Sequence, residues 1–295
     1  MIQVKNHHGI KLFYPDIILN DEILFKTAKV LKKIIPEGGV SVRYIACAQT
    51  DKGKSESINE DCIAYFSKIQ NENKILLLIV CDGVGGLSYG EVASHCLVHE
   101  FRRWFSLLDE RIFQNKKWED QIIEQWNSLL FHANQKLRQV GKRHYSMIGT
   151  TLSSLILYKN TYVLFHIGDS RVYKIKHFVR VISKDHTLYE KNKKEFFYGF
   201  HNNKEKEKHI LTQCVGVTSG LRPYVKVGRV TKNTNFLLCS DGFYQKLKKK
   251  EIKMYFSPKH CRRKERIRCA LRTCIKLVKE REEMDNISAV VVTCR

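Results

Sequence analysis

The residues of this chain best suited to chemistry are carboxylates that stand at the ends of apolar runs. Residues 80–94 read VCDGVGGLSYGEVAS, so the apolar run 75–81 ends abruptly in Asp82, with three glycines close behind. A strand that carries an aspartate to its end, with glycines clearing room beside it, can hold a cation near a substrate. Carboxylate oxygens are ligands that Mg²⁺ and Mn²⁺ prefer.

Four further aspartates share this position at a turn or at the end of an apolar run. They are Asp61 in INEDC, Asp169 in IGDSR, Asp241 in CSDGF and Asp285 in MDNIS. A single Asp-Gly step is usually only a turn. Five carboxylates in one context would repel one another unless a cation compensated their charge. The set therefore predicts one shared, oxygen-lined metal site.

The glycines after Asp82 do not form another known phosphate-binding or catalytic motif. Ser88 stands where a dinucleotide fingerprint has its third glycine, and Asp82 would face a pyrophosphate with like charge. A Walker loop is excluded because no G-K-[ST] step occurs in the right place. Neither a G-x-S-x-G elbow nor an H-E-x-x-H motif occurs.

Apolar runs and helical periodicity predict the elements that must position these aspartates. Strands are predicted at 42–48, 62–66, 75–81, 151–157, 162–167, 171–175, 236–239 and 287–293, and helices over 93–108, 122–140 and 267–278. The runs 151–157 and 162–167 are separated by four residues, as in a hairpin. This spacing favours antiparallel sheets packed between helices over a doubly wound parallel sheet.

We interpret residues 1–40 as an N-terminal extension and residues 41–295 as one domain. In the extension, Asp21 can cap a short helix over 22–35, which we expect to pack on the domain surface, with a docking role as the alternative. The polar, lysine-rich segment 190–208 is predicted to be a loop or flap.

The composition is that of a globular protein, with 43% hydrophobic residues. No run approaches the ~18 apolar residues of a membrane helix, and the first residues lack the apolar core of a signal peptide. Ten cysteines occur without a C-x-x-C pair, which favours a reducing compartment. We therefore expect a cytoplasmic protein with no membrane partner.

The chain carries a large positive charge, with 52 Lys and Arg against 30 Asp and Glu, a formal net charge of +22. A nucleic acid or another acidic partner is one interpretation. We favour a solvated basic surface, because the basic residues are spread along the chain and no ribonucleoprotein motif or zinc-finger spacing occurs. A positive field would still draw phosphorylated substrates toward the site.

The order of motifs provides a specific resemblance. The chain contains, in this order, the motifs NED, DGVGG with GEVAS, GTTL, GDSRVY, KDHT, LTQCVG, LLCSDG and DNISAVVV. This ordered set is similar to the metal-dependent protein serine/threonine phosphatases of type 2C, the PPM family, in their bacterial form. The resemblance covers residues 41–295. It implies an α+β fold, a four-layer α-β-β-α sandwich of two antiparallel sheets flanked by helices, with a dinuclear metal centre at one end.

The resemblance also implies a metal-binding role for each strand-end aspartate. Asp82 would bridge two Mn²⁺ or Mg²⁺ ions, and the Gly83 carbonyl would bind one of them. Asp241 and Asp285 would complete the ligands of the second ion. Asp169, together with Asp241, matches the site of a third ion in bacterial relatives.

Other motif residues would support this centre. By the same resemblance, Glu60 and Asp61 would hold metal-bound waters, and Asn286 would orient its neighbour. Thr150 and Thr151 would support the core beside the site.

The implied activity is hydrolysis of phosphoserine and phosphothreonine in proteins, by a water activated at the dinuclear centre and without a covalent enzyme intermediate. The partner would be a phosphorylated protein, and the enzyme would oppose a serine/threonine kinase in signalling. The alternative is a catalytically weak, phosphatase-like regulatory module that binds a partner.

Two positions depart from the family pattern. Val84 stands where many eukaryotic members have a histidine, and Glu56 stands where the family usually has an arginine that binds substrate phosphate. Three explanations of Glu56 compete: a shifted loop that lets Lys52, Lys54 or Arg43 serve, phosphate binding by the metals alone, or a regulatory protein that binds phosphate poorly. We hypothesise the second, because every expected metal carboxylate is present.

Five other residues near these motifs have structural interpretations. His186 in KDHT is interpreted as a hydrogen-bonding loop residue, His166 as a satisfied histidine of the core or surface, and Arg171 as one half of an ion pair. Cys81 and Cys239 are interpreted as packing residues, because soft thiols are not expected ligands of Mg²⁺ or Mn²⁺.

Overall fold

The computed structural model describes residues 43–54, 58–70, 72–84, 89–193 and 204–295, together with the backbone of 2–5 and 11–14. The chain divides into two compact units, Met1–Val40 and Ser41–Arg295. In the first unit, β1 (Ile2–Lys5) and β2 (Lys11–Tyr14) form an antiparallel pair. The predicted helix over 22–35, and Glu56, lie outside the described residues.

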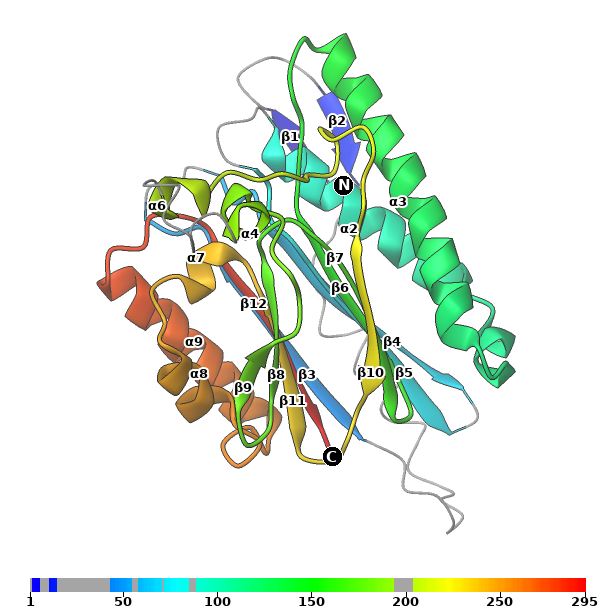
Figure 1. Cartoon of the computed structure of the whole chain (residues 1–295), viewed down its shortest axis with the longest axis vertical. Coiled ribbons are helices and arrows are strands. Elements are labelled where there is room, and N and C mark those ends of the chain that lie inside the picture. Colours follow the sequence, from blue (N-terminus) through cyan, green and yellow to red (C-terminus); the bar gives the residue numbers. More distant parts are fainter. Residues whose placement is uncertain are drawn as a thin grey trace. The chain divides into compact units, whose positions relative to one another are not determined.

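Two five-stranded sheets, antiparallel throughout, form the second unit (Figure 1). The first sheet has the order β10-β7-β6-β5-β4, made of β4 (Cys62–Gln70), β5 (Asn73–Cys81), β6 (Leu152–Tyr158), β7 (Thr161–Ile167) and β10 (Tyr224–Arg229). The second has the order β3-β12-β11-β8-β9, made of β3 (Tyr44–Asp51), β8 (Arg171–Ile175), β9 (Val179–Val181), β11 (Thr234–Cys239) and β12 (Ile287–Cys294). The eight predicted strands are confirmed, whereas β1, β2, β9 and β10 were not predicted.

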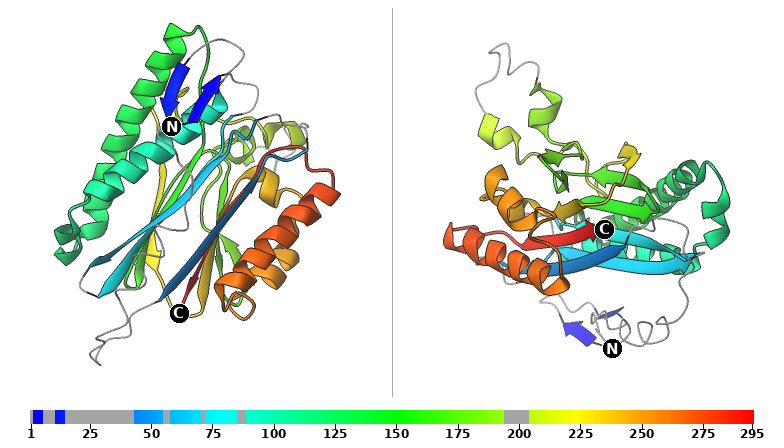
Figure 2. Two further views of the ribbon diagram at one scale, coloured as in Figure 1. Left: turned by 180° about the vertical axis from the view of Figure 1, so that it is seen from behind. Right: turned by 90° about the horizontal axis from the view of Figure 1, so that it is seen from below.

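Helices cover the outer face of each sheet, as Figures 1 and 2 show. The first sheet is covered by α2 (Gly90–Leu107) and α3 (Trp118–Arg143), and the second by α8 (Lys249–Phe256) and α9 (Lys264–Glu280). Four short helices are η1 (Glu110–Gln114), α4 (Leu188–Lys191), α6 (Lys204–Glu207) and α7 (Asp241–Tyr244). The expected four-layer α-β-β-α sandwich is confirmed. The segment 190–208, predicted as a loop, carries parts of α4 and all of α6 in its described portion.

The alternation of side chains along β5 explains why this strand reads as an unbroken apolar run. Ile75, Leu77 and Ile79 pack against α2 and α3, whereas the alternate residues Leu76 and Leu78 face the second sheet. All five side chains are at most 1% exposed. A strand with a helix layer on one face and a sheet on the other has no solvent-facing side, so the side chains on both of its faces must be apolar.

The register of the strands brings the predicted aspartates to one end of the sandwich. Cys62 pairs with Cys81, so Asp61 and Asp82 lie at adjacent strand ends of the first sheet. Cys239 pairs with Ala289, which places Asp241 and Asp285 at adjacent strand ends of the second sheet. Asp169 lies in the connection between β7 and β8, where the chain crosses from one sheet to the other.

Candidate active site

The five aspartates lie close enough to influence one another strongly. Asp61 and Asp169 are buried, at 5% and 8% exposure, Asp82 and Asp241 are half-buried, and Asp285 is exposed. Burial raises the pKa of the Asp82 carboxyl well above its ordinary value, and the charges of the other four aspartates raise it further. We call these five residues the acidic cluster.

Three other members of the acidic cluster also have raised pKa values. Burial is the largest cause for each, and it raises the pKa of Asp61 and of Asp241 to about 7 and that of Asp169 to about 8. The charge of Asp285 adds to the shift of Asp241, and that of Asp241 adds to the shift of Asp169. With no cation present, the protein environment therefore favours the neutral form of these carboxyl groups.

The acidic cluster fits a divalent cation by its donor chemistry. Both carboxylate oxygens of Asp61 are buried without a hydrogen-bonding partner. The nearby hydroxyls of Ser240 and Ser288 lower the pKa of Asp61, but burial raises it by more. Oxygen-only donor sets of this kind suit Mg²⁺ and Mn²⁺. Among the described residues, no three His, Cys, Asp or Glu side chains are placed so that together they could hold a metal ion. A bound cation would compensate the mutual repulsion of these carboxylates.

Two threonines hold the backbone of Asp82. The Asp82 amide donates to Thr151 Oγ1 at 3.0 Å, and the Asp82 carbonyl accepts from the Thr151 amide at 2.8 Å and from Thr150 Oγ1 at 2.9 Å. The Thr151 hydroxyl also hydrogen-bonds the Ser170 hydroxyl at 2.8 Å, beside Asp169. The expected support of the site by these threonines is therefore present, and it links two parts of the acidic cluster.

Gly83 is needed for a close approach between three segments. A Cβ atom at Gly83 would lie 2.7 Å from the Glu60 Cβ, from the Glu60 carbonyl oxygen and from the Gly90 carbonyl carbon. The Glu60 carbonyl accepts from the Gly83 amide at 3.2 Å and from the Ser94 hydroxyl at 2.6 Å. The start of α2, the end of β5 and the loop before β4 are thereby fixed together.

Asn286 ties Asp285 to the loop that precedes β4. Its side-chain oxygen accepts from the Glu60 amide at 2.7 Å, and its side-chain nitrogen donates to the Lys52 carbonyl at 2.9 Å. Its own amide donates to Asp285 Oδ1 at 2.7 Å. The side chain is 4% exposed, so these bonds are shielded from water.

The sequence interpretation missed Glu283, a buried carboxylate next to the acidic cluster. The side chain is 7% exposed, and its Oε1 accepts from the amides of Met284 at 3.1 Å and Asp285 at 3.4 Å. Its Oε2 is buried without a partner, and its charge contributes to the raised pKa of Asp241. Glu283 stands in a run of charged residues two positions before the strand-end motif, so only its spacing from Asp285 could have singled it out.

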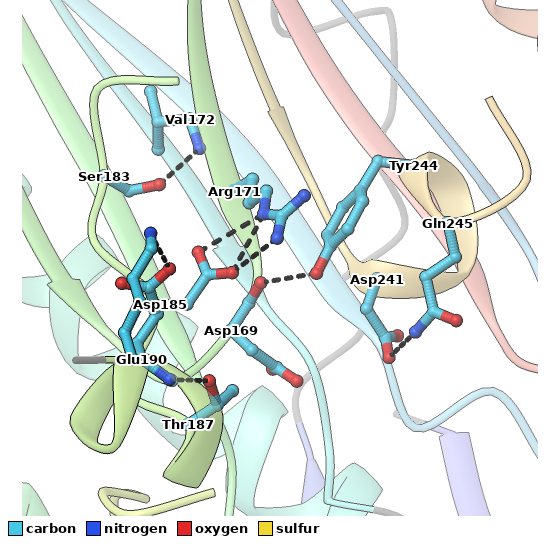
Figure 3. A network of polar contacts seen from close by, with 12 residues as sticks. Asp169, Arg171, Val172, Ser183, Asp185, Thr187, Glu190, Asp241, Tyr244 and Gln245 are labelled. Carbon is cyan, nitrogen blue, oxygen red and sulfur yellow. Dashed lines mark hydrogen bonds and ion pairs between the residues drawn. The ribbon is translucent and has the colours of Figure 1, made fainter. Parts of the chain in front are cut away.

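Arg171 is confirmed as one half of an ion pair. Its Nη2 lies 2.7 Å and its Nε 2.9 Å from Asp185 Oδ2, and its guanidinium lies 4.1 Å from the centre of the Tyr244 ring (Figure 3). The Tyr244 hydroxyl donates to the Asp169 carbonyl at 3.1 Å. Gln245 donates to Asp241 Oδ2 at 2.6 Å. This network positions Asp169 and Asp241.

The two histidines are confirmed as hydrogen-bonding structural residues. His166 is fully buried, and its Nε2 lies 3.0 Å from the Gly168 carbonyl and its Nδ1 2.8 Å from the Ser153 hydroxyl. Since a carbonyl only accepts, Nε2 carries the proton. The Gly168 amide donates to His186 Nδ1 at 3.2 Å. Burial lowers the pKa of His166 to about 3 and that of His186 to about 4.

The two cysteines next to the acidic cluster are confirmed as packing residues. Cys81 and Cys239 are fully buried in the apolar layers against the helices. All ten cysteines of the chain are free.

The candidate replacements for the usual phosphate-binding arginine lie at opposite ends of β3. Arg43 pairs with Arg295 next to the far end of β12, about 26 Å along the strand from the acidic cluster at ~3.3 Å per residue. It is therefore too distant for this role. Lys52 and Lys54 lie at the near end, and Lys54 lines a cavity of about 390 Å³ together with Arg272 and other residues of α9.

Comparison with known proteins agrees with this geometry. Residues 49–275 match the family model of protein phosphatase 2C. The chain is 28% identical over 211 residues to the protein phosphatase PhpP of Streptococcus pneumoniae, in a match that covers 69% of this chain and 80% of PhpP.

Solved structures share the fold. The serine/threonine phosphatase of S. agalactiae matches with a TM-score of 0.72 and 22% identity, covering 85% of this chain and 99% of that chain. The catalytic domain of the serine/threonine protein phosphatase PstP, in complex with two manganese ions, matches with a TM-score of 0.65 and 21% identity, covering 86% and 99%. In the described part of the chain, every helix is too short or too polar to span a bilayer.

Proposed function

This chain belongs to the protein phosphatase 2C family, and from that membership we propose that it hydrolyses phosphoserine and phosphothreonine in proteins with two bound Mn²⁺ or Mg²⁺ ions. The membership confirms the enzyme class expected from the motifs, a protein serine/threonine phosphatase. The observation that carries the metal-dependent mechanism is the acidic cluster: both carboxylate oxygens of Asp61 are buried without a partner, and the pKa of Asp82 is raised by burial and by the other four aspartates.

The residues proposed to hold the two ions are the carboxylates of Asp82, Asp241 and Asp285 and the carbonyl of Gly83. Asp169 would contribute, with Asp241, to a third ion. When bound, such ions supply a nucleophilic water at neutral pH and neutralise the charge of the phosphoryl oxygens. Glu60 and Asp61 are proposed to hold waters around the ions, with Asn286 as their support.

The contribution of the chain itself is to hold these oxygens still. Thr150 and Thr151 fix the backbone of Asp82 from two sides, and Asn286 and Glu283 bond the backbone or carboxylate of Asp285. Hydrolysis of a phosphate monoester needs roughly 20 kcal/mol of barrier lowering. A misplacement of about 1 Å can cost on the order of 100-fold in rate, so these supporting bonds are part of the catalytic design.

The phosphate of the substrate is proposed to be bound mainly by the ions, and Lys54, at the near end of β3, is a described cation that could assist. Val84 cannot donate a proton, so the leaving seryl or threonyl oxygen would take its proton from water or from another group. The proposed partner is the phosphorylated product of a serine/threonine kinase, which this enzyme would oppose.

The test is release of phosphate from p-nitrophenyl phosphate and from a phosphothreonine peptide, measured with Mn²⁺, with Mg²⁺ and with chelator. We expect turnover that requires a metal ion and that Asp241→Asn abolishes. The matched control is Asp109→Asn, which makes the same chemical change at an exposed helix cap. If folded, metal-loaded protein released no phosphate, the regulatory binding module would replace the enzyme.

A further inference from the structure

A groove between α8 and the start of α9 carries a concentration of positive charge that the proposed reaction does not use. It has a volume of about 700 Å³, and its charged lining residues are Lys259, Arg262, Arg263 and Arg266 together with His260. No aspartate or glutamate lines this groove. We call it the basic groove.

The cations of the basic groove are available to a partner. Arg262, Arg263 and Arg266 are exposed, and within the described residues none of them forms an ion pair with an acid. The first turn of α9 adds the positive end of a 17-residue helix. The acid in that turn, Glu265, does not line the groove.

The basic groove lies at the opposite end of the second sheet from the acidic cluster. Thr293 donates to the Cys261 carbonyl at 3.1 Å, and Asn235 donates to the Phe256 carbonyl at 2.8 Å. Asn235 and Thr293 pair at the ends of β11 and β12 that are remote from Asp241 and Asp285. The six residues of β11 span ~20 Å, so the groove cannot touch the phosphate that is cleaved.

We propose that the basic groove docks an acidic segment of the phosphoprotein substrate, at a distance from the phosphorylated residue; this rests on the proposed function. Arginine guanidinium groups bind carboxylates with two hydrogen bonds, which favours glutamate and aspartate side chains as the bound groups. The volume is in the range of ligand clefts, ~300–1,000 Å³. An extended peptide can enter a cleft of this volume between two helices.

A second copy of this chain is a poor occupant. The chain has a net charge of +22, so two copies repel one another over long range. A substrate segment rich in carboxylates is attracted by the same field, and it would raise the effective concentration of the phosphorylated residue at the acidic cluster.

The experiment compares two phosphothreonine peptides that differ only in a tail. One carries six glutamates at the end of a flexible Gly/Ser linker of about 20 residues, which reaches ~25 Å; the other carries the linker alone. For the wild-type protein we expect kcat/KM to be about 10-fold higher with the glutamate tail, an advantage that falls as salt is added. The variant Arg262→Glu/Arg266→Glu should lose this advantage and keep its activity on the tailless peptide and on p-nitrophenyl phosphate.

The control variant is Arg102→Glu/Arg103→Glu, which makes the same change of charge on exposed residues of α2. It should keep the advantage of the tailed peptide. The proposal is overturned if the wild type shows no preference for the tail, or if both double variants lose the preference equally. Equal loss would mean that net charge, and not the groove, attracts the peptide.

A binding measurement separates the failure of this proposal from the failure of the proposed function. Fluorescence anisotropy of a labelled, unphosphorylated glutamate peptide needs no turnover. Binding that only the groove variant loses supports docking even if no phosphate is released. If single-stranded oligonucleotides or anionic vesicles bind more tightly than the peptide and lose binding in the groove variant, the acidic-peptide proposal is overturned.

Discussion

Carboxylates at one end of the sandwich differ in their partners: Asp185 forms an ion pair with an arginine, whereas Asp61 and Asp169 form none within the described residues. Asp185, whose side chain is 11% exposed, receives the guanidinium of Arg171 at 2.7 Å. Asp61 and Asp169 are buried to a similar degree, at 5% and 8% exposure, yet no cation within the described residues pairs with either. The chain thus neutralises Asp185 with an ion pair and leaves Asp61 and Asp169 of the acidic cluster without one, although the charge of Arg171 offsets part of the raised pKa of Asp169.

This difference has an energetic consequence. A buried carboxylate without a cation favours the folded state only when it is protonated. The acidic cluster therefore makes the metal-free fold less stable at neutral pH, whereas the Arg171–Asp185 pair does not depend on added ions. A cation that binds the folded state alone should stabilise it by mass action, so occupation of the cluster and folding are expected to be linked.

The largest test of the comparison removes one carboxylate from the acidic cluster. Asp82→Asn should lower kcat on the order of 10³-fold, because the residue proposed to bridge both ions loses its charge. The same variant should leave the melting temperature in chelator unchanged or raise it, since a repelling charge is gone. Activity is measured with a phosphothreonine peptide and stability by calorimetry. A large loss of stability in chelator would mean that Asp82 is compensated from within the chain.

The second test adds the missing cation. At 100 times its dissociation constant, Mn²⁺ should stabilise the fold by about 2.7 kcal/mol. The raised pKa values of Asp61, Asp169 and Asp241, about 7 to 8, mean that the metal-free folded state keeps protons that the unfolded chain has released above pH 4. Stability in chelator should therefore fall as pH rises from about 4 to about 8, and the fall should still be measurable between pH 6.5 and 8.

The measurement for this second test is the melting temperature across that pH range, with Mn²⁺ and with chelator. The fall should be present in chelator and much smaller with Mn²⁺, because bound ions stabilise the charged carboxylates. Equal slopes under the two conditions would show that the acidic cluster does not hold the ions.

The third test breaks the compensated carboxylate. Arg171→Met should destabilise the fold by about 2 kcal/mol, less than the 3–5 kcal/mol of a fully buried pair, because the Arg171 side chain is 33% exposed. Urea unfolding measures this change. Lys136→Met, which breaks the more exposed pair with Glu100, is the control and should cost less than about 1 kcal/mol. Similar losses in both variants would mean that Asp185 does not need its cation.

The comparison also explains what could be predicted from the sequence. Asp82, Asp241 and Asp285 adjoin apolar runs of fixed register, so the sequence predicts that they meet at one edge. Glu283 adjoins no run, and its carboxylate is placed by the turn in which it accepts from the amides of Met284 and Asp285. Among the strands, β9 has three residues and β10 alternates with exposed positions. Their pairing is decided by tertiary contacts and not by local apolar pattern.

The smallest expected effect concerns His166, a buried residue whose two ring nitrogens both have hydrogen-bonding partners without any ion. The pKa of His166 is lowered to about 3. Below pH 6.5, the imidazole of His166 therefore binds a proton in the unfolded chain that it does not bind in the folded state. This histidine therefore contributes stability that is complete above pH 6.5 and is lost as pH falls. Between pH 6 and pH 5 the loss should be about 1 kcal/mol.

The variant His166→Gln removes this uptake of a proton by the unfolded chain. Because the acidic cluster makes stability in chelator fall as pH rises, the loss of this opposing contribution should steepen the fall between pH 5 and 6.5 and leave the slope between pH 6.5 and 8 unchanged. Stability is measured by urea unfolding at closely spaced pH values in chelator, with His132→Gln, an exposed histidine of α3, as the control. An unchanged acid slope in His166→Gln would show that His166 titrates in the folded state. Loss of the slope between pH 6.5 and 8 in His166→Gln would mean that the pKa of His166 is raised in the folded state, because only groups with raised pKa values destabilise the fold as pH rises.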